Sequence, residues 1–208
     1  AETVVRYLCG HSERALSAAQ RLRAVAEEQG IQEVKAMAAM TEAAARSEAG
    51  EEEAVVSLVE SGIEACRTYG AVLTKAYVLA VGAEALMRVG RGSAALALVE
   101  EAQASIAAGA ARFWEPELHR LRAEIHLRAG SAADRPGADE HFAAAHRIAE
   151  QQGSKSLTLR CALRRGSLWR SEGREKQARD IVEVALRAID DGAASRDVVA
   201  AHAFISGG

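Results

Sequence analysis

The sequence is poor in residues that build strands, tight turns and disulfide frameworks. Of its 208 residues only 2 are Pro and 3 are Cys, and aromatic residues make up 4%. The apolar residues are dominated by Ala, which favours closely approaching helices over a strand-rich core. Since hydrophobic residues still make up 49% of the chain, a substantial core can be buried and we predict an all-α fold.

The cysteines Cys9, Cys66 and Cys161 lie far apart and form no CxxC pair. We interpret them as reduced thiols and expect a cytoplasmic protein. No apolar run approaches the roughly 18 residues of a membrane span, and no signal-peptide pattern is present. The net charge of −3, with both signs interleaved, argues against a nucleic-acid or membrane surface. The chain begins at Ala1 in helix-like sequence, so we expect a piece of a longer protein.

Glycines recur along the chain in two interleaved series. One is Gly10, Gly50, Gly90, Gly130 and Gly173, with spacings of 40, 40, 40 and 43 residues. The other is Gly30, Gly70, Gly109 or Ala110, Gly153 and Gly192. Glycine ends a helix in the left-handed conformation without steric cost, so the series predict two helices of roughly 17–19 residues per repeat. The longest interval contains 134–137 (DRPG), which we interpret as a loop insertion of about three residues.

Small residues occupy fixed positions relative to the first glycine series. Positions five, nine and twelve residues after each glycine lie on one helical face, where small side chains let a neighbouring helix approach. They are Ala15, Ala19, Leu22, Val55, Val59, Gly62, Ala95, Val99, Ala102, Ala178, Val182 and Ala185, and, once the insertion of about three residues after Gly130 is allowed for, Ala138, Phe142 and Ala145. Seven residues before the glycines come Ala43, Ala83, Ala123 and Gly166. We expect both sets at helix–helix contacts.

This order of small residues and glycine resembles the tetratricopeptide repeat, best of all in the unit that contains Gly90, Ala95, Val99 and Ala102. The period of about 40 exceeds the usual 34 residues, and Gly replaces the Pro that normally closes each unit. The resemblance implies a right-handed superhelical solenoid of antiparallel helix pairs in a single domain, 1–208. Its units are approximately 1–30, 31–70, 71–110, 111–153 and 154–192, with a capping helix at 193–208.

Three stretches in the second half carry a further resemblance: 112–124 (RFWEPELHRLRAE), 141–149 (HFAAAHRIA) and 153–160 (GSKSLTLR). They are similar to the C-terminal repeat region of bacterial signalling proteins with a nucleotide cyclase or regulatory ATPase domain, and of LuxR-type or maltose-activator-like transcription regulators. The resemblance implies a sensory or scaffolding module. The ATPase, cyclase and DNA-binding parts would lie outside this chain.

In solenoids of this family the first helix of each pair lines a concave groove, which implies a set of partner-binding residues. By register with the family these are Tyr77, Glu84, Glu117, Arg120, Glu124, Arg160 and Arg170. The family's Leu before each small position is here Glu42, Gly82, Arg122 or Arg165, so the set can be shifted by one position. A groove rich in Glu and Arg favours a polar peptide or helix over an apolar ligand.

The sequence near Arg170 holds further arginines, which allow two interpretations, and Trp169. Arg160 and Arg164 lie one turn apart and suit a partner's carboxylate or phosphate, or else belong to a solvated face that acidic neighbours balance. Trp169 is expected in the core, opposite Gly166.

Sequence motifs for catalysis, nucleotides and metals are lacking: there is no GxxxxGK[ST], GxSxG or HExxH. His119 and His126 share a helix face, and His141 and His146 follow on the next helix, but their spacing is not that of a zinc enzyme. We therefore expect no catalytic site, no cofactor and no metal. An enzyme with an unrecognised histidine site is the third hypothesis.

The leading hypothesis is a non-catalytic protein-interaction module that binds a peptide, a partner protein or other domains of its parent chain. The second is a small-molecule sensor, in which the superhelix encloses a ligand. Unsatisfied terminal helices, around 3–9 and 194–205, are also expected to let copies of the chain pair end to end.

Overall fold

The computed structural model describes residues 12–70, 74–130, 135–189 and 195–207, which contain ten α-helices and no strand. The helices are α2 (Ser12–Gln29), α3 (Gln32–Glu48), α4 (Glu52–Tyr69), α5 (Lys75–Arg88), α6 (Gly92–Ala107), α7 (Glu115–Ala129), α8 (Arg135–Gln151), α9 (Lys155–Ser171), α10 (Glu175–Arg187) and α11 (Arg196–Ser206). The predicted all-α fold is confirmed. The expected helix before Cys9 lies outside the described residues, as do Gly10 and Gly192.

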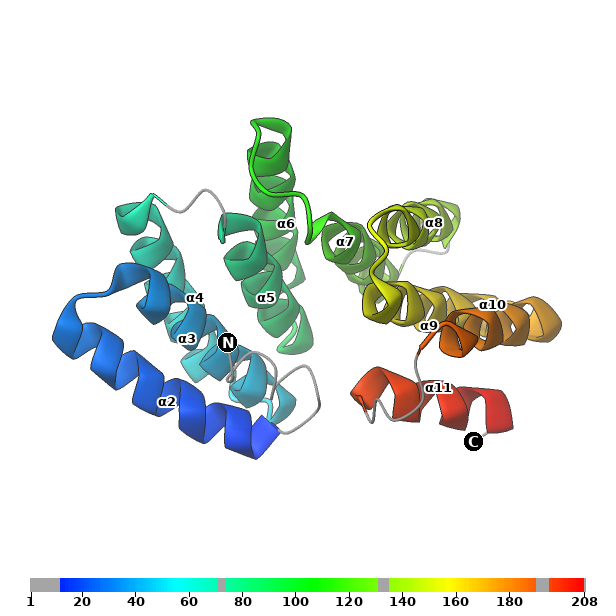
Figure 1. Cartoon of the computed structure of the whole chain (residues 1–208), viewed down its shortest axis with the longest axis horizontal. Coiled ribbons are helices and arrows are strands. Elements are labelled where there is room, and N and C mark those ends of the chain that lie inside the picture. The colour runs from blue at the N-terminus through cyan, green and yellow to red at the C-terminus, as the bar shows by residue number, and fades with distance from the viewer. Residues whose placement is uncertain (1–11, 71–73, 131–134, 190–194, 208) are drawn as a thin grey trace. The chain divides into compact units, whose positions relative to one another are not determined.

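The chain forms two compact units, Ala1–Trp114 and Glu115–Gly208. In the first unit α2 packs on α3, α3 packs on α4 and α5, and α5 also packs on α4 and α6. In the second, α7 packs on α8 and α9, α8 packs on α9, and α9 and α10 pack on each other and on α11 (Figure 1). Helices that are neighbours in the sequence are therefore neighbours in space within each unit. The single domain over 1–208 stays a prediction.

Glycines end the helices where the sequence places them. Gly30, Gly50, Gly70, Gly90, Gly109, Gly130, Gly153 and Gly173 all have φ between 65° and 101°. At the end of α9 the Gly173 nitrogen donates to the Arg170 carbonyl at 3.0 Å, and the Arg174 nitrogen donates to the Trp169 carbonyl at 2.9 Å. This pair of bonds satisfies carbonyls that the helix end would otherwise leave without partners.

Helix lengths and one loop differ from the prediction. The helices contain between 11 and 18 residues, and the 17–19 expected for each repeat helix is too long for α5, α6, α7 and α10. The expected loop at 134–137 is wrong for its last three residues, because Arg135, Pro136 and Gly137 form the first turn of α8. Proline is accommodated there because the first N–H groups of a helix have no intrahelical acceptor.

The predicted packing positions are confirmed. All of the small-residue set except Leu22 is buried, and so are Ala43, Ala83, Ala123 and Gly166. Gly166 shows why size matters, since a Cβ there would lie 3.0 Å from the Ala178 carbonyl oxygen and 3.1 Å from Val182 Cγ2. None of the described helices is long and apolar enough to cross a membrane.

Candidate binding site

A buried ion-pair cluster begins on α7, where three charged residues share one helix face. Arg120, which is 1% exposed, donates from Nε and Nη2 to the Glu117 carboxylate, the shorter distance being 2.8 Å. Its Nη1 lies 2.6 Å from Oε1 of Glu124. Spacings of three and four residues bring these side chains together on a helix.

The cluster continues across α9 to α11. Arg160 Nη1 donates to Glu117 Oε2 at 3.2 Å, and its Nε and Nη2 donate to Asp197 Oδ2 at 2.9 and 2.8 Å. Arg164 Nε lies 3.1 Å from Glu124 Oε1. Burial alone would lower the pKa of Arg160, but the charges of Glu117 and Asp197 outweigh it and raise the pKa above its ordinary value.

We call this set the ion-pair ladder, because it crosses α7, α9 and α11 in steps. Its six members are Glu117, Arg120, Glu124, Arg160, Arg164 and Asp197. Three cations meet three anions, so the ladder compensates its own charge. A buried cation that keeps its partners is stable, whereas one left without them is costly.

The ladder gathers four of the seven predicted groove residues: Glu117, Arg120, Glu124 and Arg160. Their carboxylates and guanidinium groups bind one another rather than presenting open hydrogen-bonding groups. Asp197 is not among the residues predicted from the sequence. Its only sequence signal is an acidic residue in the first turn of the last helix, which helix-end electrostatics also favours.

The other three predicted groove residues lie elsewhere. Tyr77 on α5 is 5% exposed and packs against Trp114 in a tilted arrangement, with ring centroids 5.2 Å apart. Glu84 pairs with Arg88 at 2.6 Å on the same helix. Arg170 on α9 pairs with Glu175, donates to the Phe204 carbonyl at 2.9 Å and lies over the Phe204 ring. The partner-binding role of all seven residues stays a prediction.

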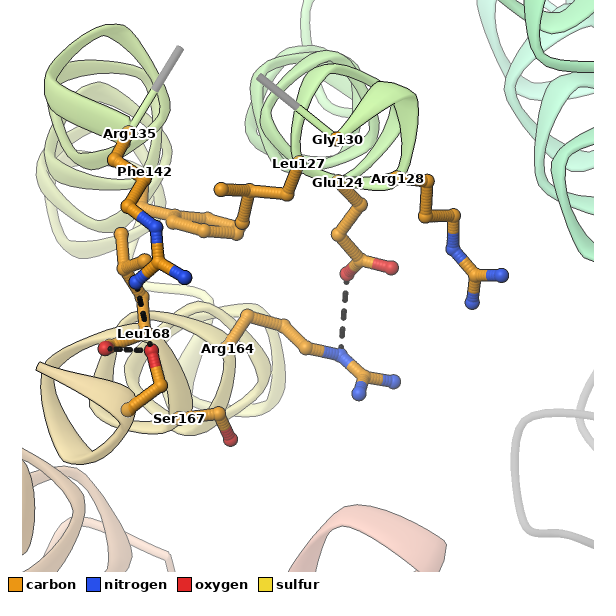
Figure 2. Close-up of a pocket in the computed structure, with 10 residues that line it drawn as sticks. Glu124, Leu127, Arg128, Gly130, Arg135, Phe142, Arg164, Ser167 and Leu168 are labelled. Carbon is orange, nitrogen blue, oxygen red and sulfur yellow. Dashed lines mark hydrogen bonds and ion pairs between the residues drawn. The ribbon is translucent and has the colours of Figure 1, made fainter. Parts of the chain in front are cut away.

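Beside the ladder, residues of α7, α8 and α9 line an open pocket of about 440 Å³. Its lining residues are Glu124, Leu127, Arg128, Gly130, Arg135, Phe142, Arg164, Ser167, Leu168 and Ser171. Figure 2 shows Arg135 of α8 on one side and Arg164 of α9 on the other, with Leu127 and Phe142 between them. We call this the arginine pocket.

The apolar part of the arginine pocket belongs to the core of the second unit. Phe142 is 1% exposed and Leu168 is 5% exposed, and both pack in one cluster with Ala123 and Ala138, against which Leu127 rests. Because these side chains are held by packing, the pocket is formed before any ligand arrives.

The rim of the arginine pocket carries excess positive charge. Glu124, the one acidic residue among the described residues that line it, is already shared by Arg120 and Arg164. Arg128 and Arg135 are exposed, and neither has a carboxylate within ion-pair distance among the residues that the structure describes. Within the described chain, the one hydrogen bond of Arg135 is from Nη1 to Ser171 Oγ, at 3.3 Å. Two guanidinium groups at the rim can therefore take an anionic ligand.

A second pocket, of about 470 Å³, lies in the first unit between α4, α5 and α6. Its charged residues pair with one another, since Glu101 lies 3.0 Å from Lys75 and 3.8 Å from Arg67. Cys66 contributes a buried free thiol whose pKa burial raises, which keeps it protonated. The arginine pocket, whose two rim arginines have no carboxylate partner among the described residues, is the stronger candidate.

The predicted histidine pair meets across α7 and α8. His119 Nδ1 lies 3.4 Å from His141 Nδ1, and His126 stacks on His141 with ring centroids 6.5 Å apart. Burial lowers the pKa of both His119 and His141. No group of three or more His, Cys, Asp or Glu in the described part of the chain is arranged to hold a metal ion.

Trp169 is not where the sequence places it. The indole is half-buried between the guanidinium groups of Arg165 and Arg174, each 4.4 Å from the ring centroid, and its Nε1 donates to Asp139 at 2.9 Å. Burial alone would raise the pKa of Asp139, but the hydrogen bonds and charges of its donors hold it below its ordinary value. The expectation that Trp169 faces Gly166 is wrong, because two residues on the same helix three positions apart point along one face rather than toward each other.

No protein-family model matches the sequence, and no curated protein matches it.

Proposed function

We propose that this chain is a non-catalytic protein-interaction module made of tetratricopeptide-like helix pairs. In this proposal the pairs stack in a right-handed superhelix, and the second unit presents the arginine pocket to a polypeptide partner. The parent would be a bacterial signalling or transcription-regulatory protein, and the partner a separate protein or another domain of that parent.

One observation supports the proposal above others. In the second unit α7 and α9, the first helices of two successive pairs, contact each other, and α9 contacts the capping helix α11; the ion-pair ladder joins all three. Repeat scaffolds are built in this way, with each pair resting on its neighbours and one row of helices lining a surface. Such surfaces bind polypeptides because a row of helices offers many contacts along an extended segment.

Site-specific photo-crosslinking in cells of the source organism tests this proposal. A photoreactive residue in place of Ser167, in the arginine pocket, should give a crosslinked partner that mass spectrometry identifies. The matched position is Val184 on α10, which is 64% exposed and does not line the pocket. Adducts of equal yield from both positions, or from neither, would contradict a partner surface at the pocket.

The volume of the pockets favours a second candidate, a small-molecule sensor. Both pockets fall within the roughly 300–1,000 Å³ typical of small-ligand sites. A thermal-shift screen of metabolites separates the two functions. A bound metabolite raises the midpoint with concentration as RT ln(1 + [L]/Kd), whereas a protein-interaction module shows no such response.

A further inference from the structure

The chemistry of the arginine pocket specifies a kind of ligand. Its inner wall is apolar, with Leu127, Phe142 and Leu168 side by side, and its rim carries Arg128 and Arg135 without carboxylate partners in the described chain. A ligand that fits both parts has an apolar side chain that packs on the inner wall, and carboxylates that reach the two arginines of the rim.

The hydroxyl groups in the pocket do not compete with the arginines as donors. Ser167 Oγ donates to the Leu163 carbonyl at 2.8 Å, and Ser171 Oγ donates to the Leu168 carbonyl at 2.7 Å. Each hydroxyl has a single hydrogen, so the pocket offers its guanidinium groups to an anion. Guanidinium groups bind carboxylates with two parallel hydrogen bonds.

The spatial order of these groups suits an extended segment rather than a compact anion. Arg135 stands at one side of the apolar residues, while Arg128 extends past Glu124, away from them (Figure 2). Carboxylates on both sides of one apolar side chain match this order. Nucleic-acid bases would need an exposed aromatic face to stack on, and the one aromatic residue among the described residues that line the pocket, Phe142, is 1% exposed.

We infer that the arginine pocket binds an acidic segment of a partner protein, with an apolar side chain against Leu127, Phe142 and Leu168 and flanking carboxylates on Arg128 and Arg135. This inference rests on the proposed function, because it names the partner chemistry of the same module. It does not use the ion-pair ladder, whose arginines are already engaged.

Fluorescence anisotropy with defined peptides tests the inference on the full chain. The probe is a fluorescein-labelled peptide with one Leu between two pairs of Asp. Two matched peptides carry Asn in place of Asp, or Ala in place of Leu. The test variant is Arg128→Glu/Arg135→Glu, and the control is Lys176→Glu/Arg187→Glu, which makes the same charge change at exposed positions of α10. Circular dichroism checks that both variants keep their helices.

We expect the Asp–Leu peptide to bind, and the Arg128→Glu/Arg135→Glu variant to weaken its Kd at least about tenfold. The Lys176→Glu/Arg187→Glu variant should keep the Kd within about twofold of the original. The Asn peptide and the Ala peptide should each bind several-fold more weakly, since one lacks the charges and the other lacks the apolar anchor.

Three results overturn the inference. They are no binding of the Asp–Leu peptide up to about 1 mM, an equal loss in both variants, and tighter binding of a labelled RNA oligonucleotide with the same sensitivity to Arg128 and Arg135. If the Ser167 crosslink identifies a protein partner while the peptide fails, only the chemistry assigned to the pocket is wrong. If the crosslink also fails, the proposed function falls with it.

Discussion

Replacing Arg120 by Leu removes the centre of the ion-pair ladder. The guanidinium is 1% exposed and donates to two carboxylates, those of Glu117 and Glu124. Taking one partner from a buried ion pair costs about 3–5 kcal/mol, because the remaining charge stays buried. Glu117 still has Arg160 and Glu124 still has Arg164, so we expect the lower end of this range, about 3 kcal/mol of unfolding free energy.

Urea unfolding followed by Trp169 fluorescence measures this loss, with Trp114 replaced by Phe so that only the second unit is reported. The slope of free energy against urea should stay constant while the midpoint falls. Arg187→Leu is the control: this side chain is 76% exposed, so its loss should leave the midpoint unchanged within error.

A second substitution tests whether the cost comes from buried charge. Glu117→Gln in the Arg120→Leu background removes one carboxylate that Arg120 neutralised. The double variant should be more stable than the sum of the two single losses predicts, by about 1–2 kcal/mol. Two results would show that buried charge at this position does not destabilise the fold. One is strict additivity of the two losses in unfolding free energy, and the other is a loss of less than about 1 kcal/mol for Arg120→Leu.

Three further outcomes follow from the second unit. Asp139→Asn should lower the urea midpoint at neutral pH. Because the folded pKa of Asp139 lies below its ordinary 3.8, the stability that it contributes is complete above that value and is lost as the pH falls through the folded pKa. The difference in midpoint should therefore shrink as the pH falls below 3.8, and a difference that does not shrink contradicts this cause. Burial lowers the pKa of His119 below 6.5, so the folded protein loses stability as the pH falls from 6.5 through the folded pKa. His119→Gln should therefore make the thermal midpoint fall less between about pH 7 and 5. An unchanged dependence of the midpoint on pH rejects this cause. Gly166→Ala should lower the free energy of unfolding by about 1–3 kcal/mol, because the new Cβ would lie 3.0 Å from a backbone oxygen. Gly137 has open space around it, so Gly137→Ala should leave the free energy of unfolding unchanged or raise it by up to about 1 kcal/mol in the same urea assay.

The sequence predicted the helices and their contacts because both depend on local chemistry. A glycine such as Gly90 can take the positive φ that a helix end needs wherever the rest of the chain goes. Small residues at Ala95, Val99 and Ala102 mark the buried face because they recur at helical spacing, and all three are buried.

The partners of the charged residues could not be predicted in the same way. Arg160 has acceptors on two other helices, Glu117 on α7 and Asp197 on α11, and these pairings depend on how far each helix is rotated about its axis. Alignment with a family's repeat pattern determines that rotation only to within one residue. A shift of one residue along a helix rotates the direction of the side chain by about 100°. The arginine pocket was missed for the same reason, since Arg128 and Arg135 line one pocket only when α7, α8 and α9 pack.

Hydrogen exchange on a chain that lacks residues 195–208 tests the stacked-repeat arrangement most directly. Stacked pairs depend on their nearest neighbours, so removing α11 should lower amide protection most in α9 and α10, which contact it, and progressively less in α8 and α7. Equal loss of protection in α7, α8, α9 and α10 would mean that the second unit has one shared core, and would contradict a scaffold of stacked helix pairs.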